Sequence, residues 1–491
     1  SFISEHGGFN EDYTISEDEI KLSLNLLLID NKVAIEDTED ENRIIYITFY
    51  KFIEDEIVRY LDNIVNAPIK HICNAEEVNK FIEVYELQTG LKLAENQKNA
   101  VHMVMGNNFS ILSGGPGTGK TQTINTIISC FKAAKPDAQI SLAAPTGRAA
   151  KRMTELTGVE AKTIHRLIGL NCFREGRPQL IEIDADLLIV DETSMIDVYV
   201  FYNILSVIPE TTRILLVGDY QQLPSVGPGL ILRDLIDSGE IKTTILTEIF
   251  RQKDGSQIIE NAHKIINGDN NLSLDDTKGD FYFINQPVQW KIQKLIILSI
   301  KRLLETGYKL EDIQVLSVFN EGDLGVIELN KRIQEKFNPK YQVIPEIRIS
   351  DDKCLRLYDK VMQTVNNYNL EVFNGEVGVI KYMNLDNEEV IVDFGDKEVT
   401  YNMGTIGELT LAYAITVFKG QGSEFDVIIM PFHTSLEILL NRNTIYTGLT
   451  RAKKRVICIG DREEFNSGID KKDSMERNSI LKYKLNKCFK S

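Results

Sequence analysis

The stretch SGGPGTGKT at residues 113–121 decides the fold. It satisfies the pattern G-x-x-x-x-G-K-[ST], and it stands between an apolar run at residues 109–112 and a helical run, as a phosphate-binding loop requires. Glycines let backbone N–H groups curl around phosphates, and the N-terminus of the following helix adds a partial positive charge. The stretch therefore predicts a nucleotide site in which Lys120 reaches the β- and γ-phosphates and the Thr121 hydroxyl binds Mg²⁺.

A second motif, DLLIVDE at residues 186–192, ends an apolar strand with two carboxylates. We expect Asp191 to hold Mg²⁺ and Glu192 to orient and deprotonate the attacking water. An acidic pair at this place can also be no more than the start of a loop. Its position about 70 residues after a phosphate-binding loop favours the catalytic interpretation, and two adjacent acids indicate hydrolysis.

Two further groups of polar residues are also placed where they can act on the nucleotide phosphates. The segment GDYQQLP at residues 218–224 ends another apolar strand, so a glutamine carried there can sense the γ-phosphate. Arg251 and Arg451 lie beyond the first α/β unit, and guanidinium groups that arrive from a second unit would stabilise charge on the transferring phosphoryl group. Surface salt bridges are the alternative role for both arginines.

The pattern of elements predicts an α/β protein with more than one core. A chain of 491 residues is too long for a single hydrophobic core. Apolar strand runs at 109–112, 140–144, 187–190 and 214–217 alternate with helical runs, as in a parallel α/β unit. Similar runs at 313–318, 425–430 and 455–459 indicate a second unit, and short β-rich runs separated by turns between 359 and 402 indicate a small inserted barrel.

Charge and cysteine usage exclude several classes of protein. The 55 basic and 72 acidic residues give a net charge of -17, which argues against a protein that coats nucleic acid through a global positive field. Basic stretches at 145–178 and 471–491 fit either local polyanion sites or solvated helix faces. The six cysteines form no C-x-x-C pair, so we expect reduced thiols, a cytoplasmic protein and no structural zinc.

The ends and the hydropathy pattern add two expectations. No apolar run approaches the roughly 18 residues that a membrane span needs. The start at Ser1 is followed by acidic residues and does not resemble a signal peptide, so we expect a trimmed or processed beginning.

Eight segments in a fixed order carry a family resemblance: GGPGTGKT, APTGRAAKRM, KTIHRLIG, LLIVDETSMID, VGDYQQLPSVGPG, LTEIFRQ, AYAITVFKGQGSEFDVIIM and YTGLTRAKKRV. Together they resemble the motif series of superfamily 1 DNA helicases, and they are most similar to the RecD-like branch, which includes RecD and the TraA-type proteins. The resemblance runs from about Leu93 to Gly460 and so covers most of the chain.

The resemblance implies two RecA-like P-loop NTPase lobes, a small all-β SH3-like insertion and an N-terminal helical or winged-helix-like module. The expected ranges are an acidic N-terminal module at 1–85, a first lobe at 86–250, a second lobe at 251–340 and 406–491, and the SH3-like barrel at 341–405. It further implies ATP and Mg²⁺ as cofactors, and single-stranded DNA and single/double-strand junctions as partners, with movement from 5′ to 3′ on the strand. The N-terminal module is the candidate site for protein partners, and a hairpin at about 171–183 matches the β-hairpin pin of the family.

The resemblance also assigns roles to individual residues. Gln97 matches the glutamine that recognises adenine, Gln222 matches the γ-phosphate sensor, and Arg251 and Arg451 match the two arginines of the later motifs. The implied nucleotide-binding residues are Gln97, Gly115, Pro116, Gly117, Thr118, Gly119, Lys120, Thr121 and Gln122. The implied DNA-binding residues are Pro145, Thr146, Gly147, Arg148, Thr163, His165, Thr416, Lys419 and Gln421. Without the resemblance, His165 would be interpreted as a histidine at the edge of the core.

Two departures from the family pattern stand out. The usual HKSQG is FKGQG here, so Phe418 and Gly420 replace an imidazole and a hydroxyl, which puts a DNA or coupling contact in doubt. The upstream helix-hairpin-helix region of longer relatives has no recognisable counterpart.

The resulting hypothesis is an ATP-dependent DNA helicase. One alternative is an ATP-driven switch or loader that never unwinds a duplex, and another is a non-enzymatic scaffold subunit. The complete set of Lys120, Asp191, Glu192, Gln222 and two arginines counts against the scaffold. DNA repair, recombination and element transfer all remain open as pathways.

Overall fold

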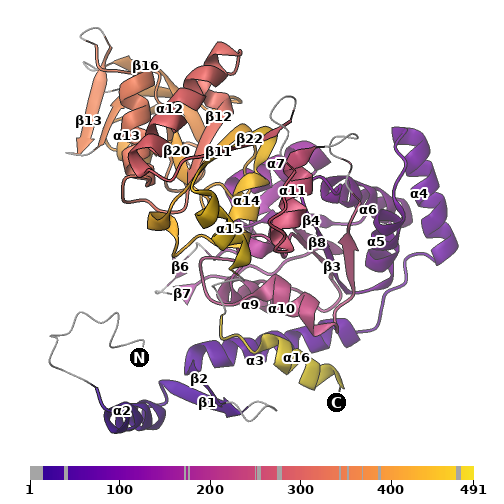
Figure 1. Cartoon of the computed structure of the whole chain (residues 1–491). Helices are drawn as coiled ribbons and strands as arrows, with labels where there is room; N and C mark the ends of the chain where they lie inside the picture. Colours follow the sequence, from indigo (N-terminus) through magenta and orange to yellow (C-terminus); the bar gives the residue numbers. More distant parts are fainter. Residues whose placement is uncertain are drawn as a thin grey trace.

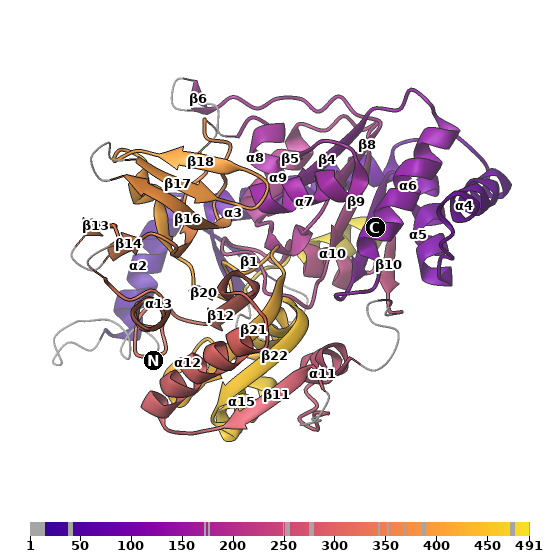
Figure 2. The ribbon, with the colours of Figure 1, turned by 90° about the horizontal axis from the view of Figure 1, so that it is seen from above.

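The computed structural model describes residues 15–37, 43–170, 173–174, 177–248, 250, 256–273, 279–341, 344–350, 353–367, 369–384, 389–471 and 477–490. Two α/β lobes lie side by side, a β-rich domain extends from the second lobe, and an N-terminal module lies at the edge of the first (Figure 1). Figure 2 shows the same arrangement from above.

The N-terminal module begins with helix α2 (Glu17–Ile29), which Ser16 caps by accepting a hydrogen bond from the Glu19 backbone. Strands β1 (Val33–Asp37) and β2 (Arg43–Ile47) pair antiparallel, and α3 (Thr48–Asn66) follows directly. The helix buries Ile53, Ile57, Leu61 and Ile64, whose spacing of three and four residues forms one apolar stripe. This stripe packs against α9 (Val198–Ser206) of the first lobe, so α3 belongs to the core of that lobe.

The first lobe is built on a six-stranded parallel sheet in the order β10-β3-β9-β8-β4-β5. One core on this sheet includes residues of α4, α5 and α6, and a second core includes residues of α3, α9 and α10. The strands are β3 (Phe109–Gly114), β4 (Ile140–Ala144), β5 (Ala161–Thr163), β8 (Leu187–Val190), β9 (Arg213–Gly218) and β10 (Thr243–Leu246). The helices are α4 (Ala75–Thr89), α5 (Glu95–Gly106), α6 (Lys120–Ala134), α7 (Gly147–Thr157), α8 (Ile164–Leu167), α9 (Val198–Ser206) and α10 (Ile231–Ser238).

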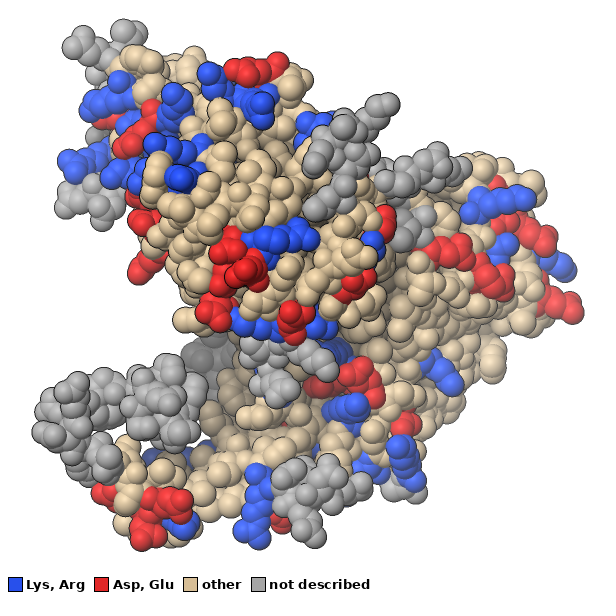
Figure 3. Space-filling model, in the orientation of Figure 1, with Lys and Arg blue, Asp and Glu red and all other residues tan. Residues whose placement is uncertain are grey.

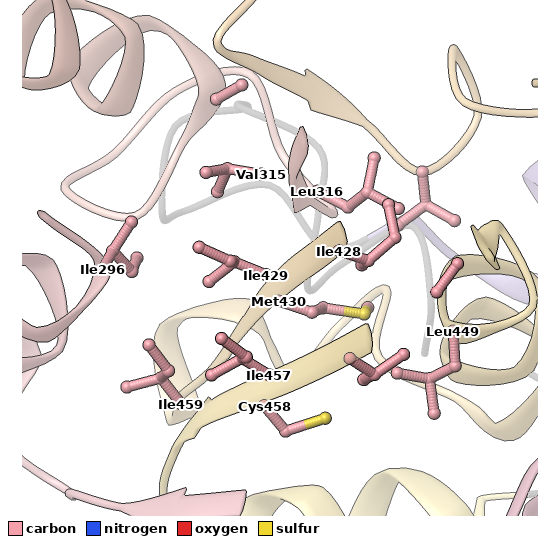
Figure 4. Packing of buried hydrophobic residues seen from close by; sticks show 14 of the residues in the cluster. Ile296, Val315, Leu316, Ile428, Ile429, Met430, Leu449, Ile457, Cys458 and Ile459 are labelled. Carbon is pink, nitrogen blue, oxygen red and sulfur yellow. The ribbon is translucent and has the colours of Figure 1, made fainter. Parts of the chain in front are cut away.

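The second lobe has a five-stranded parallel sheet in the order β11-β22-β21-β12-β20. Its central strands are buried over most of their length, and Figure 4 shows Val315, Ile429 and Ile457 of three neighbouring strands packed in one layer. The strands are β11 (Phe281–Asn285), β12 (Ile313–Ser317), β20 (Ala414–Thr416), β21 (Phe425–Phe432) and β22 (Ala452–Gly460). The helices are α11 (Gln257–Ile266), α12 (Gln289–Glu305), α13 (Val326–Phe337), α14 (Arg442–Leu449) and α15 (Arg462–Asp470).

The inserted β domain interrupts the second lobe between α13 and β20. Its antiparallel sheet has the order β18-β17-β16-β15-β19, and a hairpin of β13 and β14 accompanies it. The last strand pairs with β15 in a register that sets Leu411 opposite Val361, so the domain continues beyond the expected end at residue 405. The strands are β13 (Glu346–Ser350), β14 (Lys353–Arg356), β15 (Lys360–Gln363), β16 (Val377–Asn384), β17 (Glu389–Asp393), β18 (Glu398–Tyr401) and β19 (Leu409–Leu411).

The C-terminal helix α16 (Leu481–Lys490) departs from the expected ranges. The range 406–491 was assigned to the second lobe, but α16 packs against α3 and α10 of the first lobe. The physical reason is its apolar stripe, because Leu481 and Leu485 are fully buried there. Helix α4 also lies in the range expected for the N-terminal module, yet it buries Val78 and Ile82 on the first-lobe sheet.

The expected hairpin at 171–183 is present in part. Strands β6 (Phe173–Arg174) and β7 (Arg177–Pro178) pair antiparallel. Gly176, in the predicted exposed tip, lies outside the described residues.

Candidate active site

The phosphate-binding loop joins β3 to α6, as the sequence predicts. Gly117 and Gly119 have φ angles of 75° and 82°, in the left-handed region that favours glycine. A Cβ atom on Gly119 would lie 2.4 Å from the Gln97 Nε2 atom, so a side chain at this position would also clash. The Lys120 Nζ atom donates hydrogen bonds to the backbone oxygens of Gly114 at 2.6 Å and Gly115 at 3.1 Å, which keeps the ammonium group over the loop.

Gln97 lies against this loop from the first turn of α5. Its side chain is buried, and its Oε1 atom accepts a hydrogen bond from the Ala94 backbone at 3.0 Å, which fixes the amide group. Gln122, by contrast, points away from the loop, because its Nε2 atom donates to the Tyr85 hydroxyl at 2.8 Å.

Phe250 is a loop neighbour that the sequence analysis missed. Its backbone N–H donates to the Gly117 oxygen at 2.8 Å, and its half-exposed ring lies over Gly119. The available signal in the sequence was the position of Phe250, directly before the motif arginine Arg251. Arg251 itself lies outside the described residues, so its predicted role stays a prediction.

The acidic pair follows β8, at the same edge of the sheet as the phosphate-binding loop. The Glu192 backbone N–H donates to the Asp191 Oδ1 atom at 2.8 Å. Burial raises the pKa of Asp191 to about 6, and the negative charge of Glu192 adds to this effect. Glu192 has a φ angle of 51°, a left-handed conformation that costs a non-glycine residue about 1–3 kcal/mol and that is typical of functional sites.

The phosphate-binding loop and the acidic pair line one cleft of about 450 Å³ between the two lobes, whereas Gln97 and Gln122 are not among its lining residues. The first lobe contributes the phosphate-binding loop and the acidic pair, and the second lobe contributes Thr450 and Arg451. An ion pair of 2.9 Å between Arg152 and Glu424 joins the lobes at the cleft. The predicted site residues that line it are Gly115, Pro116, Gly117, Thr118, Gly119, Lys120, Thr121, Asp191, Glu192, Gln222 and Arg451.

Gln222 lies in the loop at residues 218–229, which follows β9. Its Nε2 atom donates to the Asp219 Oδ2 atom at 3.1 Å, and its Oε1 atom is buried with no hydrogen-bond partner among the described residues. The Tyr446 hydroxyl, from α14 of the second lobe, donates to the same Asp219 oxygen at 2.8 Å. Burial and the Asp219 carboxylate raise the pKa of Tyr446, so the phenol keeps its proton and remains a donor.

Three more hydrogen bonds tie the start of this loop to the second lobe. The Asn443 Nδ2 atom donates to the Gln221 oxygen at 2.9 Å. The Leu223 backbone N–H donates to the Thr447 hydroxyl at 2.9 Å, and the Gln421 Nε2 atom donates to the Leu223 oxygen at 2.9 Å. Gln421, which was predicted to contact DNA, is therefore engaged between the lobes here. Neither Asn443 nor Tyr446 was singled out from the sequence.

Arg451 is almost fully buried in the cleft, directly before β22. Its Nε atom donates to the Thr447 oxygen at 3.2 Å, which holds the side chain along the end of α14. The second-lobe arginine therefore faces the same cleft as Lys120.

The predicted DNA residues of the first lobe follow β4 and β5, which are neighbours at one edge of the sheet. Thr146 caps α7 by accepting from the Ala149 backbone at 3.2 Å, and Thr163 caps α8 by accepting from Arg166 at 3.3 Å. Burial lowers the pKa of His165, which lies in α8. Pro145, between β4 and Thr146, is half-buried.

The inserted β domain covers part of this predicted DNA surface. A Cβ atom on Gly147 would lie 2.1 Å from the Phe373 ring, so the two elements are in close contact. Burial lowers the pKa of Arg148, whose guanidinium lies 5.5 Å from the centre of the Phe425 ring.

In the second lobe the predicted DNA residues follow β20. The Thr416 hydroxyl accepts from the Lys419 backbone at 3.2 Å, and Lys419 is exposed. The structure explains why Phe418 and Gly420 depart from the family pattern. Phe418 packs against the second-lobe core, and a Cβ atom on Gly420 would lie 3.3 Å from the Val417 oxygen, which leaves little room for a side chain.

Charge is distributed unevenly over the surface. Figure 3 shows basic side chains gathered on the part of one face that carries α12 and α13. Lys294, Arg332 and Lys336 line a hollow of about 390 Å³ there, together with Glu335. No motif of the sequence analysis marked this surface.

Comparisons with known proteins agree with this geometry. Residues 97–228 match the AAA domain, residues 329–394 match the ATP-dependent RecD-like DNA helicase SH3 domain, and residues 411–459 match the UvrD-like helicase C-terminal domain. The chain is 34% identical over 374 residues to the ATP-dependent RecD2 DNA helicase of Deinococcus radiodurans, an alignment that covers 75% of this chain and 49% of that protein. The chain is therefore similar to RecD-like helicases over about three quarters of its length.

Another relative and a solved structure extend the likeness. This RecD-like chain is 28% identical over 429 residues to the RecBCD enzyme subunit RecD of Mycolicibacterium smegmatis, which covers 77% of the chain and 73% of that subunit. It spans about half the length of the Deinococcus relative. The crystal structure of Bacteroides Pif1 bound to ssDNA shares the fold, with a TM-score of 0.50, 19% identity and coverage of 78% of this chain and 95% of Pif1. Across the described parts of the chain, none of the helices combines the length and apolar character needed to cross a bilayer.

Proposed function

We propose that this RecD-like chain is an ATP-dependent DNA helicase that moves from 5′ to 3′ on single-stranded DNA and unwinds duplex DNA. The observation that carries the proposal is the cleft between the lobes, which gathers Lys120, Glu192 and Gln222 with Arg451 of the second lobe. Hydrolysis in such a cleft depends on how closely the lobes approach each other. The chemistry is therefore coupled to their relative movement.

Each side chain has a role that follows from its place. Lys120 neutralises phosphate charge, and Glu192 takes a proton from the attacking water. Gln222 and Arg451 sense and stabilise the charge that develops on the transferred phosphoryl group. We extend the arginine role to Arg251.

The donor set of the cleft fits Mg²⁺. The Thr121 hydroxyl and the Asp191 carboxylate are hard oxygen ligands, which Mg²⁺ prefers. Burial raises the pKa of Asp191 to about 6, and a bound cation would favour its charged form. When bound, Mg²⁺ would neutralise phosphate charge, and Thr121 and Asp191 would hold it.

The link to DNA rests on segments that both lobes contribute. The segments with Thr146 and His165 follow strands of the first lobe, and those with Thr416 and Lys419 follow a strand of the second. Gln421 connects the last segment to the Gln222 loop, so a change at the DNA side reaches the cleft through one hydrogen bond. This arrangement supports a motor rather than a scaffold.

The proposals for binding partners and for the pathway are less specific. Single-stranded DNA and single/double-strand junctions are the proposed partners, and the names of the relatives fit a role in DNA repair or recombination. The exposed apolar residues of α2, such as Leu22 and Leu26, are the candidate contact for a protein partner. Localisation in the cytoplasm stays a prediction.

Steady-state ATP hydrolysis with and without an oligo(dT) strand tests the proposal. A motor should hydrolyse ATP faster when single-stranded DNA is bound, and its apparent DNA affinity should fall as salt rises, because bound counterions are released. The net charge of -17 predicts a modest affinity. A rate that saturating DNA at low salt leaves unchanged would favour an ATP-driven switch instead.

A further inference from the structure

The C-terminal segment at residues 477–490 returns to the first lobe after the second lobe is complete. Helix α15 ends at Asp470 in the second lobe, and α16 lies beside α3 and α10 (Figure 1). Leu481 and Leu485 are buried in the core that these helices share with the first-lobe sheet. The segment is therefore a structural part of the first lobe.

Polar contacts fasten this segment in place. The Lys484 ammonium lies 2.7 Å from the Asp55 Oδ1 atom and 3.6 Å from Glu54. The Ser479 hydroxyl donates to the Asp234 Oδ2 atom at 2.7 Å. With the apolar stripe, these contacts hold the segment against the first lobe.

Arg477, at the start of the segment, holds the second half of the 218–229 loop. Its Nη1 atom donates to the Ser225 hydroxyl at 3.1 Å and to the Gly229 oxygen at 2.8 Å. It also donates to the Gly227 oxygen, and the Nη2 atom donates to the Ser225 oxygen. A planar guanidinium carries five donors in a fixed geometry, which allows one side chain to gather several backbone oxygens.

The two halves of this loop are thus attached to different lobes. The first half, with Gln222, is bound by Asn443, Tyr446 and Thr447 of the second lobe. The second half is bound by Arg477, which is fixed to the first lobe. A relative movement of the lobes must therefore change the shape of the loop between residues 222 and 225.

We infer that Arg477 is a positioning residue for the γ-phosphate sensor. By anchoring residues 225–229 to the first lobe, it limits how far Gln222 moves relative to Lys120 and Glu192 when the second lobe moves. The Pro228 oxygen also accepts a hydrogen bond from the Val198 backbone of the first lobe at 2.9 Å, so loss of the guanidinium would loosen residues 225–227 most. The position of Gln222 in the cleft would then be less defined. The inference rests on the proposed ATP-driven function and adds a residue outside the helicase motifs.

The test compares Arg477→Ala with the wild-type chain. We expect kcat for ATP with saturating oligo(dT) to fall about tenfold, as for the loss of a charge-assisted hydrogen-bond set. The KM for ATP and the DNA-free rate should stay within about twofold, because the substrate contacts of Lys120 are untouched. Arg477→Lys keeps the charge without the planar donor set, so its kcat should be intermediate.

Arg356→Ala is the matched control. Its guanidinium also binds a backbone oxygen, that of Asn338 at 2.9 Å, and it pairs with Glu346 at 3.2 Å in the inserted β domain. This variant should keep wild-type stimulation by DNA. Thermal unfolding of all variants separates positioning from a loss of folding.

The outcomes distinguish the two proposals. A wild-type chain that DNA does not stimulate would overturn the proposed function. A stimulated wild type together with full stimulation in Arg477→Ala would overturn only the role of Arg477. A lower unfolding temperature with a parallel loss of the DNA-free rate would also overturn it, because that result would assign Arg477 to stability alone.

Discussion

The hydrogen bond between Tyr446 and Asp219 gives the sharpest prediction about coupling between the lobes. Replacing Tyr446 by phenylalanine removes only the hydroxyl that donates to the Asp219 Oδ2 atom at 2.8 Å across the lobe boundary. The ring stays in its fully buried place. Asp219 keeps its contacts with Gln222 and the Gln221 backbone, so the loop retains its local structure.

The magnitude follows from the chemistry of the lost bond. A hydrogen bond to a carboxylate contributes about 1.5–3 kcal/mol, and a buried acceptor that loses a donor has no water to replace it. If this bond stabilises the closed cleft, its loss lowers DNA-stimulated kcat by about 10- to 150-fold, since about 1.4 kcal/mol corresponds to a factor of ten. Two remaining donors at Asp219 favour the lower end of this range.

The assay is steady-state ATP hydrolysis at saturating oligo(dT), with thermal unfolding in parallel. Tyr413→Phe is the control, because its hydroxyl also donates to a buried aspartate, Asp359, at 2.8 Å, and neither residue lines the cleft. That variant should lose stability without losing DNA stimulation. A Tyr446→Phe protein whose stimulated kcat stays within twofold of wild type would refute the reasoning.

The remaining predictions concern catalysis, unwinding and pH. Lys120→Ala should abolish ATP turnover, and Glu192→Gln should bind ATP yet hydrolyse it at least about 100-fold more slowly, which nucleotide binding and single-turnover assays can separate. Shortening the hairpin at 171–183 to a two-residue turn should preserve DNA-stimulated hydrolysis and reduce strand displacement per ATP; an unchanged ratio would leave the hairpin as a cover for a sheet edge. Burial raises the pKa of Asp234 to about 6, so the folded state binds this proton more tightly than the unfolded state. The stability that this group contributes is present at low pH and is lost as the pH rises from about 4 through 6. Asp234→Asn should therefore flatten the unfolding temperature over that range, and identical pH profiles would contradict the assignment.

Buried parallel strands were the part of the fold best predicted from the sequence. The expected runs at 140–144 and 187–190 coincide with β4 and β8, because strands covered on both faces are continuously apolar. The strand expected at 455–459 begins earlier, at Ala452, where the exposed Lys453 and Lys454 hide the pattern.

Long-range placement could not be predicted in the same way. An apolar stripe on α16 indicates that one face is buried, but it does not say against which lobe. Tyr446 and Asp219 are 227 residues apart, and neither has a local pattern that indicates its partner. The motifs identified Lys120, Glu192 and Arg451, whereas the hydrogen bonds that tie the Gln222 loop to the second lobe required the structure.

Strand displacement on tailed duplexes tests the central claim most directly. The substrates are the same duplex with a single-stranded tail at either the 5′ or the 3′ end, incubated with the chain in the presence and absence of ATP. A helicase that moves from 5′ to 3′ should release the strand from the 5′-tailed substrate only, and only with ATP. Displacement from the 3′-tailed substrate would contradict the direction, and DNA-stimulated ATP hydrolysis without any displacement would contradict unwinding and favour a loader.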